Sequence, residues 1–344
     1  MPYRSHGRPE ESRMIERRQF IVAASAFGIS TFMARAQPAG GRVVRVGSLI
    51  NGGPGPILQV FKEAFETLGY AEGRDLIFEH RFAHGQLDRL PALAGELVQA
   101  NVHVILAAGG PASRAAKGAT STIPIVFSIV TDPLLLGLVE NLALPGGNLT
   151  GLTSLDPEQA DRQMALLRSV FPKLARVGIL SDNTIPGADA SGLAPIDRAN
   201  SEAARALGIE PIVRKVAGGA KPDYASALDD MLQNGAEALL VLEVPMPLRD
   251  GKIVAEAASA RRMPSIFPGG QSSTGGMIAY GTSVLDTWPR MPVMADKILK
   301  GTAPGMIPIE TITRRELVVN LKTAHAIGIT IPEGVLKRAD RVIE

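Results

Sequence analysis

The sequence of 344 residues contains no cysteine, and this absence excludes several kinds of site. Disulfide bonds, zinc ribbons, iron–sulfur ligation and thiol catalysis all depend on cysteine sulfur. An excess of charge of one sign is also missing, because 36 Lys and Arg residues are balanced by 34 Asp and Glu. A net charge of +2 gives no electrostatic basis for binding nucleic acid, so we expect no nucleic-acid partner.

The N-terminal region lacks a hydrophobic run long enough to cross a membrane. The uncharged stretch Phe20–Met33 is shorter than the roughly 20 apolar residues that a spanning helix needs. It follows five arginines and is itself followed by Ala34-Arg35-Ala36, a small-x-small cleavage pattern. These features predict an export signal over residues 1–36, cleaved near Ala36. A buried N-terminal helix is the alternative.

The start of this uncharged stretch, Arg17-Arg18-Gln19-Phe20, resembles a twin-arginine signal, and the choice between the Sec and Tat routes stays open. Cleavage near Ala36 removes six arginines and three glutamates, so the remaining chain is close to neutral. Without a cysteine at the cleavage point, the chain cannot be anchored as a lipoprotein. We therefore expect the exported protein to be free in the periplasm.

The rest of the chain has the composition of a globular protein, with 45% hydrophobic and 20% charged residues, and a length typical of about two domains. Short β-branched segments alternate with segments of helical period, which predicts parallel sheets covered on both faces. The expected strands are Val43–Leu49, Leu76–Phe82, Val102–Ala107, Pro124–Val130, Gly275–Gly281 and Leu317–Asn320. The expected helices are Ile57–Tyr70, Leu87–Ala100, Ala112–Ala119, Asp286–Lys300 and Leu321–Ile327.

The alternating pattern occurs twice. Arg45-Val46-Gly47 reappears as Arg176-Val177-Gly178, and the strand that ends at Pro111 is matched by a strand that ends at Pro245. Such pairs in the same order predict two similar doubly wound α/β lobes joined by a hinge of several chain crossings. We assign residues 42–150 plus about 277–312 to lobe 1, and residues 151–276 plus about 313–344 to lobe 2.

Several further motifs extend over nearly the whole of this region. They are Leu68–Arg74, Ala115–Thr120, Ile123–Phe127, Thr131–Pro133, Gly137–Val139, Pro145–Gly151, Asp296–Gly301, Glu316–Ala324 and Arg338–Glu344. With these motifs the chain resembles the extracytoplasmic substrate-binding proteins of ABC transporters, in the group that contains tryptophan-binding proteins. The resemblance implies a type I periplasmic binding protein fold of two Rossmann-like lobes, with a solute enclosed between them. It does not identify the solute, because the loops at Asn51–Gly55 and Thr184–Pro186 match no fixed pattern.

In an open parallel sheet, ligands bind beyond the carboxyl ends of the strands. In lobe 1 this rule selects Asn51, Gly52, Gly109, Gly110, Ser113, Thr131 and Asp132. Gly109 and Gly110 open a helix whose free N–H groups suit a carboxylate, with Ser113 as the expected side-chain donor, although the glycines can also serve the turn alone. Asp132 can either pair with an ammonium group or cap the helix expected near Pro133.

The same rule selects Asp182, Asn183 and Glu243 in lobe 2, because each follows an aliphatic strand. Tyr280 lies in the strand that returns after lobe 2, where its ring can stack on a solute or pack in the hinge; we favour hinge packing.

Patterns typical of metal sites and catalytic centres are missing. His80 and His84 are four residues apart, but the predicted strand separates them widely. Gly52-Gly53-Pro54-Gly55 follows the first strand without the third glycine that a dinucleotide fingerprint needs. No Walker lysine, nucleophile elbow or H-E-x-x-H motif occurs. We therefore expect no metal, no cofactor and no enzymatic activity.

The sequence thus predicts a monomeric periplasmic receptor that closes two lobes over a small polar solute, an amino acid or a related small organic acid. It would deliver the solute to a cognate ABC permease in the inner membrane, and ligand binding would shift the hinge equilibrium. An exported cofactor-binding enzyme is the alternative.

Overall fold

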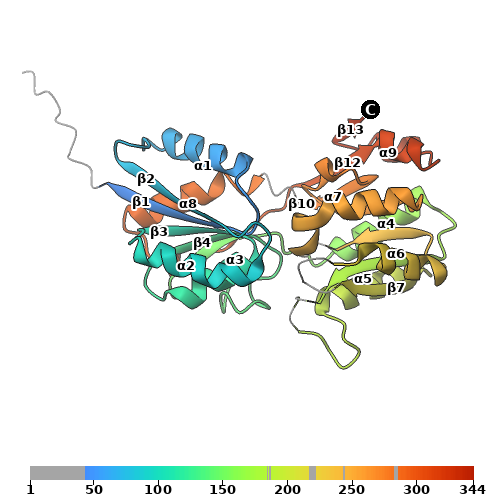
Figure 1. The fold of residues 1–344 in the computed structure, drawn as a ribbon, viewed down its shortest axis with the longest axis horizontal. Helices are drawn as coiled ribbons and strands as arrows, with labels where there is room; N and C mark the ends of the chain where they lie inside the picture. Colours follow the sequence, from blue (N-terminus) through green and yellow to red (C-terminus); the bar gives the residue numbers. More distant parts are fainter. Residues whose placement is uncertain (1–42, 184, 186, 217–221, 243–244, 283–285) are drawn as a thin grey trace, which may run out of the picture. The chain divides into compact units, whose positions relative to one another are not determined.

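The structure, a computed structural model, describes residues 43–344 except 184, 186, 217–221, 243–244 and 283–285 (Figure 1). The predicted export signal over residues 1–36, with its cleavage point near Ala36, lies outside the described residues. None of the helices in the described part of the chain is both long and apolar enough to cross a membrane.

The first lobe is built on a six-stranded sheet in which all paired strands are parallel. Across the sheet, the strands are β11 (Glu310–Thr311), β5 (Leu149–Thr153), β4 (Ile125–Val130), β3 (Val104–Ala108), β1 (Val44–Ile50) and β2 (Leu76–Phe82). Its helices are α1 (Pro56–Thr67), α2 (Leu90–Gln99), α3 (Gly110–Ala119) and α8 (Arg290–Leu299), with short 3-10 turns η1 (Leu87–Arg89) and η4 (Pro304–Met306).

The helices cover both faces of this sheet (Figure 1). Side chains of α1 and α8 pack against one face, on which Val46 and Leu106 point toward Phe61 and Phe65. Side chains of α2 and α3 pack against the other face, with Phe127 in that core. Parallel strands buried on two sides need near-continuous apolar runs, which is the pattern seen in the sequence.

The second lobe is built on a seven-stranded sheet. Its strands, in order, are β13 (Arg341–Ile343), β12 (Arg315–Asn320), β10 (Ile278–Thr282), β9 (Ser265–Pro268), β8 (Ala238–Val241), β6 (Arg176–Asp182) and β7 (Glu210–Val216). β10 and β12 are antiparallel, and the other pairs are parallel. The helical segments are α4 (Gln159–Val170), α5 (Pro195–Ala206), α6 (Tyr224–Gln233), α7 (Pro245–Ala260), η2 (Ser272–Thr274), α9 (Leu321–Ala326) and α10 (Glu333–Leu336).

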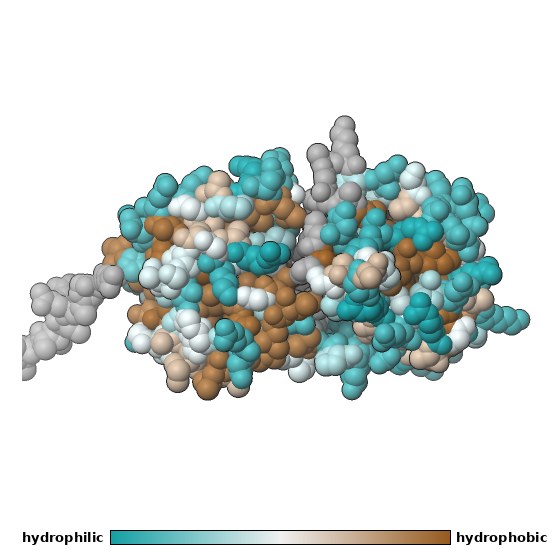
Figure 2. Space-filling view, turned by 90° about the horizontal axis from the view of Figure 1, so that it is seen from below, coloured by the Kyte–Doolittle hydropathy of each residue, from teal (hydrophilic) through white to brown (hydrophobic). Residues whose placement is uncertain are grey.

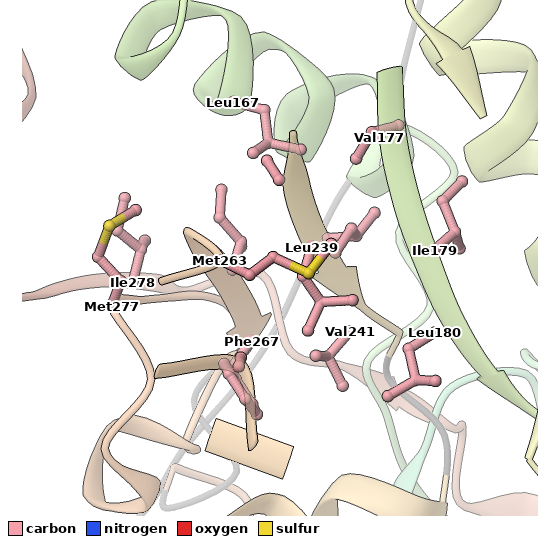
Figure 3. Close-up of a cluster of buried hydrophobic side chains, with 14 of the residues drawn as sticks. Leu167, Val177, Ile179, Leu180, Leu239, Val241, Met263, Phe267, Met277 and Ile278 are labelled. Atoms are coloured by element: carbon pink, nitrogen blue, oxygen red, sulfur yellow. The ribbon is translucent and has the colours of Figure 1, made fainter. Parts of the chain in front are cut away.

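The core of the second lobe is aliphatic and rich in methionine. In Figure 3, Met263 lies beside Leu239, and Met277 lies next to Ile278 at one edge of the cluster. Methionine fills irregular gaps between branched side chains because its thioether chain is flexible. On the face of the molecule seen in the space-filling view, apolar side chains are concentrated over part of the first lobe (Figure 2).

The two sheets confirm the predicted fold of two parallel α/β lobes. The strand order β4-β3-β1-β2 in the first lobe matches the order β9-β8-β6-β7 in the second, as the sequence repeat requires. The observed helix α8 starts later than the expected helix at Asp286, because helical hydrogen bonds begin only after Pro289.

Strand pairing differs from the expected lobe boundaries at two places. The sequence assigns residues from about 277 to lobe 1, whereas β10 pairs with β9 and β12 in the second sheet. It also assigns residues 151–153 to lobe 2, whereas these residues complete β5 in the first sheet. Both segments adjoin points where the chain passes between the sheets, after β5 and after β10. Only pairing with distant strands decides which sheet each one joins.

Candidate functional site

A pocket of about 640 Å³ is lined by residues from both lobes. Asn51, Gly109 and Thr131 reach it from the carboxyl ends of β1, β3 and β4 in the first lobe. Leu242 and Gly269 reach it from the ends of β8 and β9 in the second. The pocket therefore lies where the strand ends of two α/β sheets place a ligand site.

The first turn of helix α3 forms part of the first-lobe wall. Gly109 precedes this helix with φ 102°, a conformation that favours glycine, and Gly110, Pro111 and Arg114 line the pocket. The N–H groups of a first helical turn have no partner within the helix, and the helix dipole makes this end positive. Arg114 adds a guanidinium group with no hydrogen bond or ion pair to any described residue. This wall suits an anionic group such as a carboxylate.

The rotation of helix α3 about its axis decides which of its side chains face the pocket. Ser113, the expected donor, is fully buried, and its hydroxyl donates to the carbonyl of Gly109 at 2.8 Å, outside the pocket lining. Successive helical residues are turned by about 100°, so Arg114 faces the pocket while Ser113 faces the sheet.

Asp132 lines the pocket and also binds its own loop. One carboxylate oxygen, Oδ1, accepts from the N–H groups of Leu134 (3.0 Å) and Leu135 (2.9 Å). The segment from Pro133 to Gly137 is a turn and not the expected helix. The carboxylate thus stabilises the turn with one oxygen, and its other oxygen makes no hydrogen bond to a described residue.

The backbone of β4 is irregular where it reaches the pocket. Ile129 lines the pocket with φ 56°, and the register between β4 and β5 shifts between Phe127 and Val130. A β-branched residue in the left-handed region is strained by about 1–3 kcal/mol. Such strain is typical of functional sites, because the surrounding fold must hold the residue there.

Two asparagines that line the pocket have buried amide oxygens without a hydrogen-bond partner. Asn51 is 7% exposed and Asn200 of α5 is 4% exposed, and the Oδ1 atom of each accepts no hydrogen bond from any described residue. The orientation of Asn200 is fixed, because its Nδ2 donates to the carbonyl of Ile196 at 2.9 Å. A buried acceptor without a donor is unfavourable by about 1–3 kcal/mol, so a solute that donates to it gains that energy.

A carboxylate at the boundary of the lobes completes the polar lining. Asp156, between β5 and α4, is almost fully buried, and Oδ2 accepts from Nη1 of Arg162 at 2.7 Å and from Nε of Arg315 at 2.6 Å. Because two guanidinium groups neutralise it, Asp156 is poorly suited to bind an ammonium group. Gln163, whose Nε2 donates to the carbonyl of Tyr280 at 3.5 Å, and Gln271 also line the pocket.

Other described residues that were selected from the sequence lie outside this lining. The carbonyl of Gly52 accepts from the N–H of His84. Asp182 is 1% exposed at the end of β6, and the N–H of Asn183 donates to the carbonyl of Val216. Tyr280 packs against the core of the second lobe. Glu243 lies outside the described residues.

Much of the polar pocket lining that sequence reasoning missed belongs to the crossover after β5 and to the helices α4 and α5. Asp156 could have been selected, because it follows a strand in the same way as Asn51 and Thr131. The strand-end rule does not select Asn200, because Asn200 lies in the second turn of helix α5 and twelve residues separate this helix from β6.

Comparisons with known proteins agree with this geometry. The family model of ABC transporter substrate binding proteins matches residues 53–343. A tyrosine-binding protein of Clostridioides difficile is 25% identical to this chain over 274 residues, which cover 78% of this chain and 75% of the relative.

Two solved structures have the same fold. A conserved domain protein of Vibrio cholerae superposes with a TM-score of 0.77 at 25% identity, covering 88% of this chain and 100% of that one. The ABC domain of Streptococcus pneumoniae in complex with L-Trp gives a TM-score of 0.74 at 22% identity, covering 87% and 99%. The family match extends over most of the chain and confirms the resemblance drawn from the motifs. The chain belongs to the family of ABC transporter substrate-binding proteins.

Proposed function

We propose that this chain is a periplasmic solute receptor that captures an amino acid or a related small organic acid and delivers it to an ABC permease. The observation that carries the proposal is the pocket lined by strand ends of both sheets. Family membership supports the role in transport. The tyrosine-binding relative and the L-Trp complex of a structural neighbour support an amino acid as the solute.

The mechanism is closure of two lobes over the solute. The chain passes between the sheets after β5, after β10 and after β11, so the connections are multiple and can act as a hinge. A solute that touches Asn51 in one lobe and Asn200 in the other binds best when the lobes are closed. It therefore shifts the population toward the closed form by its difference in affinity for the two forms.

We further propose that the protein is exported by the signal over residues 1–36, that it acts as a monomer without a cofactor, and that it catalyses no reaction. The arginine-rich start, the short apolar stretch and the small-x-small pattern before Gln37 support export.

The experiment is a thermal shift assay on the purified protein, unfolded and refolded to remove any solute that co-purifies. Panels of amino acids and small organic acids are added, and small-angle X-ray scattering follows the radius of gyration. A true solute at 100 times its Kd should stabilise the protein by about 2.7 kcal/mol and reduce the radius of gyration. If no compound of either panel raises the melting temperature, the proposed function is wrong.

A matched pair of variants locates the response. Ala199 of α5 is exposed and lines the pocket, whereas Ala206 lies two turns further on the same helix and outside that pocket. Ala199→Trp should abolish the thermal shift by filling the pocket, and Ala206→Trp should retain it. Equal responses of the two variants would show that the solute binds elsewhere.

A further inference from the structure

The wall of the pocket contains no aromatic ring among the described residues. Its apolar surface comes instead from leucine, isoleucine and proline, among them Leu90, Leu136, Ile185, Pro195 and Ile196. This composition is unexpected, because one relative of the chain is a tyrosine-binding protein and one structural neighbour is a complex with L-Trp.

The aromatic residues from residue 43 onward belong to the hydrophobic cores of the two lobes. From residue 43 onward, every Phe, Tyr and Trp lies in, or packs against, one of the three hydrophobic cores. These residues are Phe61, Phe65, Tyr70, Phe78, Phe82, Phe127, Phe171, Tyr224, Phe267, Tyr280 and Trp288. The residues in the gaps of the described chain, 184, 186, 217–221, 243–244 and 283–285, include no Phe, Tyr or Trp. From residue 43 onward, the sequence therefore leaves no further ring to complete the wall.

An aromatic solute would forgo part of its usual binding energy in such a pocket. Offset or edge-to-face contact between two rings contributes about 0.5–1.5 kcal/mol beyond the burial of area, and this wall supplies no partner ring. Burial against leucine, isoleucine and proline contributes about 25 cal/mol per Å² of apolar surface for either kind of side chain. Only the aromatic one lacks a contact here that it makes in an aromatic-lined site, whereas the branched methyl groups of an aliphatic side chain find partners of their own kind.

The polar groups identify what the other end of the solute must carry. The unpartnered Oδ1 atoms of Asn51 and Asn200 are acceptors that come from opposite lobes, and both need a donor. An ammonium group has three N–H donors and can serve more than one acceptor. At the start of α3, the free N–H groups and Arg114 need an acceptor, which a carboxylate supplies.

We propose that the solute is an aliphatic α-amino acid, with its carboxylate at the start of α3 and Arg114, its ammonium group at the amide oxygens of Asn51 and Asn200, and its side chain against the leucine, isoleucine and proline wall. This inference rests on the proposed function and narrows its solute class. It departs from the tyrosine of the relative and the tryptophan of the structural neighbour.

Isothermal titration calorimetry of the refolded protein tests the side-chain part. Leucine, isoleucine and valine are compared with tryptophan, tyrosine and phenylalanine. The best aliphatic amino acid should bind about twofold to tenfold more tightly than the best aromatic one. An aromatic amino acid that binds as tightly as the best aliphatic one overturns the inference and leaves the proposed function intact. If no amino acid or small organic acid binds at all, the proposed function fails as well.

The ammonium part is tested with 4-methylpentanoate, which is leucine without its amino group. Its Kd should exceed that of leucine by about tenfold to a hundredfold, because the two amide oxygens remain unpaired. Asn200→Leu should weaken leucine binding and leave 4-methylpentanoate binding little changed, whereas Asn200→Asp, which keeps an acceptor oxygen, should retain leucine binding. Equal affinities of the native protein for leucine and 4-methylpentanoate overturn the assignment of the ammonium group.

Discussion

Asp156→Asn should destabilise the protein by removing a charge that holds two chain crossings together. Asp156 lies between β5 and α4, and its side chain is 5% exposed. Its Oδ2 atom accepts from Arg162 at 2.7 Å and from Nε of Arg315 at 2.6 Å, and Nη2 of Arg315 also contacts it. Arg315 is the first residue of β12, which follows a different crossing. One buried carboxylate therefore connects the chain after β5 with the chain after β11.

The magnitude follows from these contacts. A hydrogen bond to a charged group is worth about 1.5–3 kcal/mol, and the substitution leaves two guanidinium groups facing one neutral amide. Both guanidinium groups are partly exposed, so water recovers part of their solvation. We expect a net loss of about 2–3 kcal/mol in the free energy of unfolding. At roughly 2–4 °C per kcal/mol, the melting temperature should fall by about 4–12 °C.

Asp286→Asn is the matched control. Asp286 pairs with Arg314, the residue before Arg315, at 3.2 and 3.3 Å, but the side chain of Arg314 is 69% exposed. An exposed pair of this kind contributes about 0–1 kcal/mol and weakens in salt. Scanning calorimetry of both variants at low and high salt separates the two effects. The reasoning is refuted if the two variants lower the melting temperature equally, or if salt removes the effect of Asp156→Asn.

Three further substitutions give expected outcomes by thermal unfolding. Gly151→Ala should destabilise the protein by about 1–3 kcal/mol, because the added Cβ would lie 2.3 Å from a backbone carbonyl oxygen of β4. Gly118→Ala in α3, where nothing lies within 4 Å of the added Cβ, should be neutral or stabilising by up to about 1 kcal/mol, and similar losses for both variants would contradict this. Tyr70→Phe should lower the free energy of unfolding by about 1.5 kcal/mol, because the hydroxyl donates to the buried carboxylate of Asp296 at 2.9 Å. Burial and this hydrogen bond raise the pKa of Tyr70 to about 12, and a native Tyr70 that titrates well below that value would contradict the prediction. Burial lowers the pKa of His80 below its usual 6.5, so the stability of the native protein should fall as the pH drops below about 6.5. The difference in melting temperature between His80→Gln and the native protein should therefore be smaller at about pH 5.5 than at about pH 7.5, and an equal difference at both pH values would refute this.

Part of the first-lobe wall of the candidate site was predictable because parallel strands align their carboxyl ends. Asn51, Gly109, Gly110, Thr131 and Asp132 all follow strands that the apolar runs reveal, and all line the pocket. The rule is geometric and needs no knowledge of the second lobe, so it works from local sequence.

The same rule could not decide side-chain direction. Ser113 and Arg114 are adjacent in sequence, yet one donates to a carbonyl of its own helix and the other faces the pocket. A rotation of about 100° per residue makes the difference, and the packing of α3 on its sheet sets that rotation. Asp182 ends its strand as expected but is buried at 1% exposure.

By itself, the sequence determined the alternation of strands and helices, the repeat of one α/β pattern, the family and the scarcity of aromatic residues. These properties are carried by local periodicity, by motifs and by composition. Only the tertiary structure decided that β10 joins the second sheet, that Asn200 of α5 faces the same pocket as Asn51 of the first lobe, and that every aromatic ring from residue 43 onward is used in the cores. Contacts between residues far apart in the chain fix these features, and such contacts depend on the packing of whole elements.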